Sequence, residues 1–330
     1  MLTEGSTVVD DLTRSDPEPI QAFIHFLDGK DPKTIAAYCG TVRAFVAWLA
    51  TMPGGDPFRM ELVTTAAIRG YLESLKATGR APRTQAKAIT ALQRFCRWAQ
   101  DEGLLRRNPV AQVERPTVTT MAPTELTPEA RYVLNTLVER QDSKRLTAIV
   151  ALAYWAALRI SEVASLRIEH CAINQRSGTI TIVDSKGGKT RMLDLHNEAR
   201  RVLYDYLHEN THAPDARDPE SVYVFTGQRA AWLRRHGRPD HLSTSAIEHL
   251  WMDLKRSATR DEWEHIKGIT FHDLRHDWAH RARAAGWLLE EIAVYAGHQT
   301  KDGAPAITTT VRYTLPSRQQ LKKRLHDLSG

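Results

Sequence analysis

The chain has 330 residues, which favours two domains because a domain usually holds about 100–200 residues. Its 42% hydrophobic and 25% charged residues are typical of a globular protein, and three widely separated cysteines argue against a disulfide framework. No apolar run reaches the ~20 residues of a membrane span, and the acidic N-terminus is unlike a signal peptide. We therefore expect a cytoplasmic protein without a membrane partner.

The first half of the sequence predicts helices. Residues 1–17 are polar and acidic and are expected to form a flexible tail. Asp31-Pro32 is a favourable helix start, and apolar residues then recur at three- and four-residue spacing up to Leu49. Further helical runs lie near 68–75 and between Pro82 and Gly103. This pattern predicts a helical domain over 18–112, followed by an extended linker over 113–125.

Basic residues are concentrated in the third of these runs. The chain has 45 Lys and Arg against 39 Asp and Glu, a net charge of +6. Between residues 80 and 107 there are seven basic side chains and two acidic ones. Such a surplus on a helix is expected of a nucleic-acid contact, although a solvated helix face has the same pattern. The candidate contacts are Arg80, Arg83, Lys87, Arg94 and Arg97.

The second half is mixed. A helix is expected from Thr127-Pro128, and an almost wholly apolar helix over 146–157 is expected to be buried. Two β-like runs, 179–183 and 191–195, are joined by a glycine-containing hairpin tip, and 222–225 is a further short strand candidate. Helices follow over 243–258, 271–285 and 287–296, and 314–330 is a basic amphipathic segment. The predicted fold is mainly α with a small antiparallel β-sheet (α+β), with a second domain over 126–330.

Two candidate chemical groups lie in the first part of this domain. Arg159 stands where the buried helix ends and a new one begins. It could pair with Glu162, or it could direct its fork at a phosphate beside a helix N-terminus. Lys186 lies in the hairpin tip, where a lysine is either simply solvated or able to bring a proton to a reacting group.

The remaining candidates lie near the C-terminus. His272 and Arg275 share one face of a helix. The four-residue spacing of His272, His276 and His280 could also indicate a metal site, but an adjacent arginine repels a cation, and phosphate binding is favoured. His298 follows a glycine, and Tyr313 lies in the sequence TTTVRYT.

Together these groups suit attack on a phosphodiester without a metal. Two arginine forks can hold the non-bridging oxygens and offset charge that grows in the transition state. A tyrosine oxygen can form a covalent phosphoryl intermediate that conserves the bond energy for rejoining. A lysine can protonate the leaving sugar oxygen, and histidines can orient the phosphate or shuttle protons.

The order Arg159, Lys186, His272-x-x-Arg275, His298, Tyr313 resembles the tyrosine recombinases, also called phage integrases. The resemblance runs from about residue 18 to the end and includes ALRISEVASLR, SKGGKTRMLDL, TFHDLRHDWAHRA and YAGH. It implies specific roles. Arg159 and Arg275 would clamp the scissile phosphate, His272 and His298 would hydrogen-bond it, Lys186 would be the general acid, Tyr313 would form a 3′-phosphotyrosine, and Glu162 would buttress the first arginine.

The resemblance also implies an architecture. A helical, SAM-like core-binding domain and the catalytic domain would close on double-stranded DNA as a C-shaped clamp. Two protomers per site and four per synapse would exchange strands sequentially through a Holliday junction, with segment 314–330 docking on a neighbour. No cofactor and no metal would be needed, and an accessory DNA-binding protein is possible. Integration, excision and cointegrate or dimer resolution stay open.

Two departures from the family pattern concern the residues around the reacting groups. Ala157 stands where the family usually has Gly. Tyr313 follows His298 by fifteen residues, more than is usual, so the segment bearing the tyrosine is expected to be longer and more mobile. Tyr295 is a rival nucleophile, but it lies inside a helical pattern. The alternative functions are a type IB topoisomerase-like relaxing enzyme and a catalytically idle DNA-binding protein.

Overall fold

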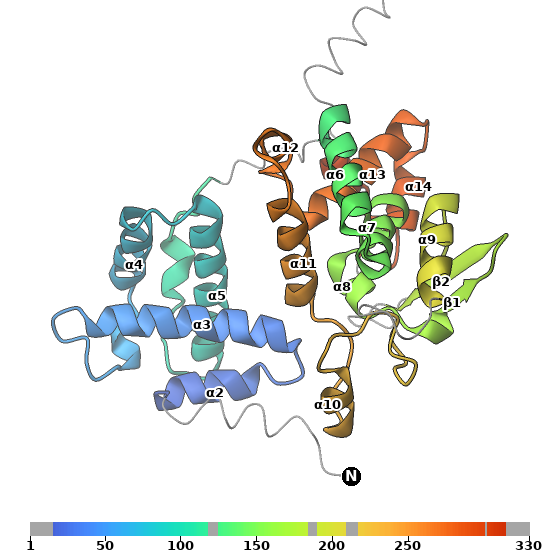
Figure 1. Cartoon of the computed structure of the whole chain (residues 1–330). Helices are drawn as coiled ribbons and strands as arrows, with labels where there is room; N and C mark the ends of the chain where they lie inside the picture. Colours follow the sequence, from blue (N-terminus) through green and yellow to red (C-terminus); the bar gives the residue numbers. More distant parts are fainter. Residues whose placement is uncertain (1–15, 118–124, 184–189, 209–216, 301, 315–330) are drawn as a thin grey trace, which may run out of the picture. The chain divides into compact units, whose positions relative to one another are not determined.

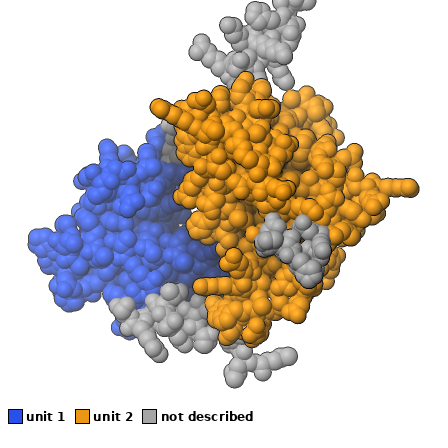
Figure 2. Space-filling view, viewed as in Figure 1, with its two compact units in different colours: residues 1–120 blue, residues 121–330 orange. Residues whose placement is uncertain are grey.

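The computed structural model describes residues 16–117, 125–183, 190–208, 217–300 and 302–314. The chain divides into two compact units, residues 1–120 and 121–330, shown in different colours in Figure 2. Each unit has a hydrophobic core of its own. Residues 1–15 of the predicted tail, most of the predicted linker, the hairpin tip with Lys186 and nearly all of 314–330 lie outside the described residues. At the end of the predicted tail, Asp16 pairs with Arg43 at 2.6 Å.

Unit 1 is helical, and its elements are α2 (Glu18–Phe26), α3 (Pro32–Ala50), α4 (Thr65–Ala77) and α5 (Pro82–Asp101), with short 3-10 turns at Met60–Leu62 and Pro109–Gln112 (Figure 1). The predicted start of α3 is confirmed, since the Asp31 side chain accepts from the backbone N–H groups of Lys33 and Thr34. Aromatic side chains of different helices meet in the core, as where Phe23 and Phe95 pack edge to face at 5.1 Å.

Unit 2 combines helices with one small sheet. Its helices are α6 (Pro128–Gln141), α7 (Lys144–Ala156), α8 (Ile160–Ala164), α9 (Asn197–Leu207), α10 (Ala230–Arg235), α11 (Thr244–Arg256), α12 (Arg260–Ile266), α13 (Phe271–Ala284), α14 (Leu289–Ala296) and α15 (Ile307–Tyr313). The predicted fold class, mainly α with a small antiparallel sheet, is confirmed. None of the described helices is long and apolar enough to cross a membrane.

The sheet has the order β1-β2-β3, and both pairs are antiparallel. Its strands are β1 (Cys171–Ile173), β2 (Gly178–Val183) and β3 (Thr190–Asp194). The predicted hairpin is confirmed, with Val183 opposite Thr190 at the end nearest the tip. The strand predicted at 222–225 is wrong, because this segment makes only an isolated bridge between Tyr223 and Arg167. The strand that completes the sheet beside the hairpin is instead β1, whose three residues are too few to show an alternating pattern.

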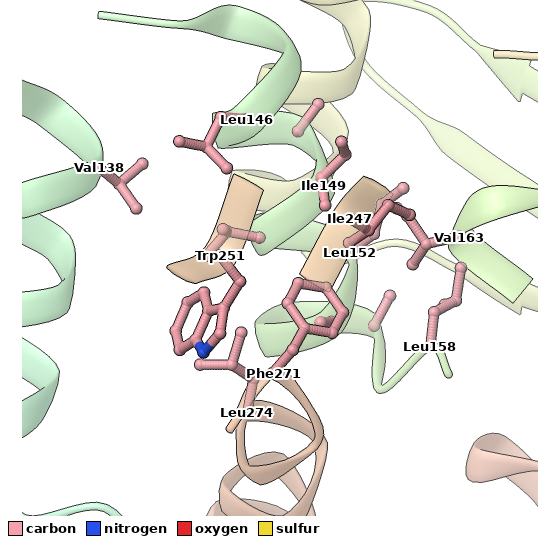
Figure 3. Close-up of a cluster of buried hydrophobic side chains, with 14 of the residues drawn as sticks. Val138, Leu146, Ile149, Leu152, Leu158, Val163, Ile247, Trp251, Phe271 and Leu274 are labelled. Atoms are coloured by element: carbon pink, nitrogen blue, oxygen red, sulfur yellow. The ribbon is translucent and has the colours of Figure 1, made fainter. Parts of the chain in front are cut away.

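Helix α7 lies at the centre of unit 2, as its apolar sequence predicts. Ile149, Leu152 and Ala153 on this helix are fully buried. Figure 3 shows Ile149 and Leu152 beside Trp251 of α11 and Phe271 and Leu274 of α13. Close packing of this kind fixes a helix against its neighbours. The core therefore sets the position of α13, the helix that bears His272 and Arg275.

Candidate active site

The site begins where α7 turns into α8. Ala157 ends α7 in the left-handed region, with a φ of 55°, which explains why glycine suits this position. The chain then extends at Arg159, and the Glu162 carboxylate accepts from both the backbone N–H (2.8 Å) and Nη1 (2.8 Å) of Arg159. The expected pairing of Arg159 with Glu162 is therefore present.

The carboxylate of Glu162 gathers three guanidinium groups. Besides Arg159, it accepts from Nη1 and Nη2 of Arg191 at 3.0 and 2.9 Å, and Nη1 of Arg275 lies 3.8 Å away. Burial alone would raise the pKa of Glu162, but the hydrogen bonds and charges of Arg191, Arg159 and Arg275 lower it to about 2. The carboxylate is therefore ionised at any physiological pH.

The C-terminal end of α14 binds the same three arginines from the other side. The carbonyls of Tyr295, Ala296 and Gly297 accept from Arg191 Nε (3.1 Å), Arg275 Nη2 (2.5 Å) and Arg159 Nη2 (2.9 Å), respectively. Free carbonyls at a helix C-terminus carry partial negative charge, which favours cations. Three consecutive carbonyls thus each position one guanidinium.

Arg275 is the most enclosed of the three arginines, with an exposed fraction of 1%. It donates to the carbonyl of Ala157, and its Nη2 lies 2.8 Å from Nε2 of His298. Burial, followed by the charge of Arg159, lowers its pKa. Its Nε is buried without a partner among the described residues, so this donor remains available to a ligand oxygen.

His298 connects the arginines to the helix that carries Tyr313. Because Arg275 can only donate, Nε2 of His298 accepts, and Nδ1 carries the proton towards Thr310 Oγ1 at 3.1 Å. Thr310 in turn donates to the carbonyl of Ala306. Burial and the charge of Arg275 lower the pKa of His298 to about 3, so the ring is neutral.

Tyr313 ends α15 among three histidines. Its Oη lies 3.3 Å from Nε2 of His272. Its ring lies 4.2 Å from the ring of His276 and 4.5 Å from that of His298. Burial lowers the pKa values of these histidines, that of His276 to about 4. The phenol therefore has neutral imidazoles as its neighbours at neutral pH.

The chain returns to His298 before the helix that carries Tyr313 begins. Gln299 and Pro305 form an isolated bridge, and the Ala306 N–H donates to the carbonyl of His298 at 2.7 Å. Helix α15 therefore starts directly beside His298. The longer spacing in the sequence does not lengthen the structural path to the tyrosine.

Tyr295, the rival nucleophile, has a structural contact instead. Its Oη donates to the carbonyl of Asp194 at 3.0 Å, and its ring stacks on Trp278 at 4.8 Å. Burial raises its pKa to about 12, which makes this phenol harder to ionise.

The charges of the cluster suit a phosphodiester. Three guanidinium groups and one carboxylate leave a net charge of +2, and the histidines add none at neutral pH. A phosphodiester carries one negative charge, and a second develops on its oxygens as a nucleophile adds. Fixed cations stabilise that change without reorganising. Among the described residues, no group of three His, Cys, Asp or Glu is arranged to hold a metal ion.

Of the six expected reacting residues, five come together here, and Lys186 lies outside the described residues. Three other residues of this cluster were not among the expected reacting residues: Arg191, which pairs with Glu162, and His276 and Thr310, which contact Tyr313 and His298. Nδ1 of His276 is buried without a partner in the described structure. Arg191 stands in the quoted segment SKGGKTRMLDL, and its position near the start of the predicted strand that follows the hairpin tip was the available signal.

The candidate DNA contacts lie on α5 and just before it. Arg83, Lys87 and Arg97 are exposed and follow one another at helical spacing on one side of the helix, and Arg80 is exposed ahead of it. None of these four has an acidic partner in the part of the chain that the structure describes. Arg94, on the same stripe, lies 4.8 Å above the ring of Phe26 and so also has a packing contact.

Comparison with known proteins places this arrangement in a family. The model for the phage integrase family matches residues 126–319, and that for the phage integrase N-terminal SAM-like domain matches residues 18–104. The chain is 28% identical to tyrosine recombinase XerD of Listeria monocytogenes serotype 4b, over 92% of this chain and 95% of that protein.

Two solved structures of lambda integrase share the fold. A dimer bound to a COC′ core site matches with a TM-score of 0.64 and 17% identity, over 89% of this chain and 75% of that one. A tetramer bound to a Holliday junction matches with a TM-score of 0.64 and 16% identity, over 95% of this chain and 82% of that one.

The chain therefore belongs to the phage integrase family. It is a site-specific DNA recombinase of the tyrosine type, as the order of its motifs indicated. Membership in this family does not favour the topoisomerase or the idle DNA-binding protein.

Proposed function

We propose that Tyr313 is the nucleophile with which this recombinase cleaves and rejoins DNA. The observation that carries the proposal is the position of its Oη, 3.3 Å from His272 and in the same chain as the arginine cluster. In the cleavage step the Tyr313 oxygen bonds to phosphorus and the bond to the 5′-oxygen breaks. The product is a 3′-phosphotyrosine and a free 5′-hydroxyl, and attack by a 5′-hydroxyl from another strand reverses the step.

The other residues divide the remaining work. Arg159 and Arg275 bind the two non-bridging oxygens, which face the net positive charge of the cluster. His272, neutral and within reach of the phenol, accepts its proton and hydrogen-bonds the phosphate. His298 keeps Arg275 in place through Nε2 and reaches the phosphate when that bond is exchanged. Lys186, on the hairpin, protonates the leaving 5′-oxygen.

The two units have different tasks in this proposal. Residues 18–112 form the core-binding domain, 113–125 the linker and 126–330 the catalytic domain. The basic residues on and just before α5 contact the DNA backbone; they are Arg80, Arg83, Lys87, Arg94 and Arg97. Contacts of this type release counterions, so affinity falls steeply with salt. Neutralising Arg83 and Lys87 should make DNA affinity less dependent on salt concentration. An unchanged salt dependence would mean that these residues face solvent and do not contact DNA.

The assembly follows from strand exchange. Two duplex sites with one cleaved strand each need four protomers for two successive exchanges. We propose a homotetramer on the synapse, a dimer on each site and a Holliday junction between the exchanges; lambda integrase has been solved as a dimer on a core site and as a tetramer on a Holliday junction. Segment 314–330 docks on a neighbouring protomer, and an accessory DNA-binding protein assists at some sites. The enzyme acts on cytoplasmic DNA.

A suicide substrate tests the chemistry. A duplex containing the site found by footprinting is nicked next to the scissile phosphate, so that the short released strand diffuses away and the covalent adduct accumulates. We expect an adduct with the wild-type chain, none with Tyr313→Phe, and a normal one with the control Tyr295→Phe. Joined products between two sites distinguish recombination from relaxation. An adduct with Tyr313→Phe would refute the assignment of the nucleophile.

A further inference from the structure

Arg191 lies at the centre of the site, yet the proposed chemistry gives it no task. It stands on β3 with 11% of its side chain exposed. Its Nη1 and Nη2 donate to the two oxygens of Glu162, and its Nε donates to the carbonyl of Tyr295. We propose that Arg191 is a positioning residue for DNA cleavage, which holds Glu162 so that Arg159 and Arg275 can bind the scissile phosphate. The inference rests on the proposed function.

The exposure of the arginines separates their tasks. Arg159 has 35% of its side chain exposed and can meet a ligand from solvent, while Arg191 lies behind the carboxylate at 11%. A paired fork on a carboxylate fixes its plane as well as its distance. Arg191 donates to both carboxylate oxygens, and Arg159 binds only Oε1 through its side chain because its Nη2 donates to the carbonyl of Gly297. Arg191 and the Gly297 carbonyl together keep Glu162 from binding both nitrogens of the Arg159 fork.

The backbone at Gly297 leaves space for the guanidinium of Arg191. Gly297 packs so closely on it that a Cβ at this position would lie 2.6 Å from Nη1 and 2.7 Å from Cζ of Arg191. Any side chain at 297 would displace the group. A surface ion pair imposes no such demand on a neighbouring element, so the close approach separates Arg191 from an ordinary salt bridge.

Removing Arg191 would free Glu162 to rotate. The carboxylate would then form a paired fork with Arg159 or move towards Arg275, which now lies 3.8 Å away. Either movement draws a clamp arginine away from the phosphate. Loss of Arg191 would therefore slow cleavage by weakening the contacts of Arg159 or Arg275 with the scissile phosphate. This effect would depend on the presence of the Glu162 carboxylate.

Arg191 has a second connection that predicts a different defect. It pairs with Ile182 across the hairpin that carries Lys186. If Arg191 only fixed the hairpin, its loss would impair protonation of the leaving oxygen. A substrate with sulfur in place of the 5′-bridging oxygen separates the two cases, because a thiolate leaves without a proton.

The experiment measures single-turnover cleavage of the suicide substrate by the full chain, with oxygen or sulfur at the 5′-bridging position. We expect Arg191→Gln to cleave about 10–100-fold more slowly on both substrates, the size of effect found when residues that orient the ligands of a metal site are removed. Arg191→Lys keeps the charge without the fork and should share most of the defect. Lys186→Ala should recover on the sulfur substrate. Recovery of Arg191→Gln to the wild-type rate on sulfur would overturn the proposal.

A double variant tests the route through Glu162. If Arg191 acts through this carboxylate, Arg191→Gln combined with Glu162→Gln should cleave no more slowly than Glu162→Gln alone, and multiplied defects would contradict the proposal. The matched control is Arg201→Gln, which removes a 61% exposed arginine paired with Glu198 and should cleave at the wild-type rate. Thermal unfolding checks that each variant is folded, and Arg191→Lys replaces Arg191→Gln if the latter is not.

The failures are distinguishable. If the wild-type chain forms no adduct, the proposed function fails, whatever Arg191 does. If the wild-type chain forms the adduct and both Arg191 variants form it equally fast, only the role of Arg191 fails.

Discussion

Gly297 is the position where a single methyl group should affect both stability and cleavage. It ends α14 with a φ of 68°, and an added Cβ would lie 2.6 Å from Nη1 of Arg191. Gly237 offers a matched comparison. Its φ is 65°, and a Cβ there would have no atom within 4 Å. Gly297→Ala and Gly237→Ala therefore share the backbone cost, while only the first displaces Arg191.

The magnitudes follow from these two contributions. Alanine in the left-handed region costs about 1–2 kcal/mol, part of which is offset because alanine restricts the unfolded chain by about 0.4–1 kcal/mol. We therefore expect Gly237→Ala to lose about 1 kcal/mol. Gly297→Ala should lose about 2 kcal/mol more, because a hydrogen bond to a charged group contributes about 1.5–3 kcal/mol and the Arg191 guanidinium makes three of them.

The assays are urea unfolding and single-turnover cleavage. Gly297→Ala should unfold at lower urea than Gly237→Ala and should cleave about 10–100-fold more slowly, since the support of Glu162 is lost. Gly237→Ala should cleave at the wild-type rate. Equal cleavage by the two variants would refute the link between the backbone at 297 and the arginine cluster.

Three further outcomes can be measured. Asp277→Ala should lower the free energy of unfolding by about 3–5 kcal/mol, because it leaves the partly buried Arg131 and Arg281 without their shared carboxylate; a urea midpoint near that of wild type would contradict this. Tyr295→Phe should lose about 0.5–1.5 kcal/mol with its bond to Asp194 and keep its adduct. His298 has a folded pKa of about 3 against an ordinary 6.5, so the unfolded chain binds more protons between these values and stability falls as pH drops through this window, by up to ~1.4 kcal/mol per pH unit. His298→Asn should flatten that slope in unfolding curves from pH 7 to 4, and an unchanged slope would assign the acid sensitivity to other groups.

The sequence predicted the parts of the fold that depend on local pattern. The start of α3 at Asp31-Pro32, the buried helix α7 and the hairpin of β2 and β3 all follow from spacing, caps and turn residues. The β1 strand did not, since three residues between turns carry no periodic signal. The supposed strand at 222–225 has β-forming residues but no neighbour to pair with beyond one bridge.

Contacts between distant segments account for the rest. Arg159 and Glu162 are three residues apart, and their pairing could be predicted from helix geometry. Arg191 reaches the same carboxylate only because the sheet register and the end of α14 bring it there. The sequence likewise did not predict that Asp277 is buried and paired. Two of its partners, Arg131 on α6 and the backbone N–H of Leu126, come from a distant segment, and only Arg281 lies one turn along α13.

The connection from the arginines to the nucleophile constrains how the site can vary. The carbonyl of Gly297 accepts from Arg159, and the next residue, His298, binds Arg275 through one ring nitrogen and Thr310 through the other. Thr310 stands three residues before Tyr313 on α15. A shift of α15 that moves the phenol must therefore change one of the two bonds of His298: the bond to Arg275 if the imidazole follows the helix, or the bond to Thr310 if it does not. The position of the nucleophile and the state of the phosphate clamp are thus mechanically coupled, and a change in one alters the other.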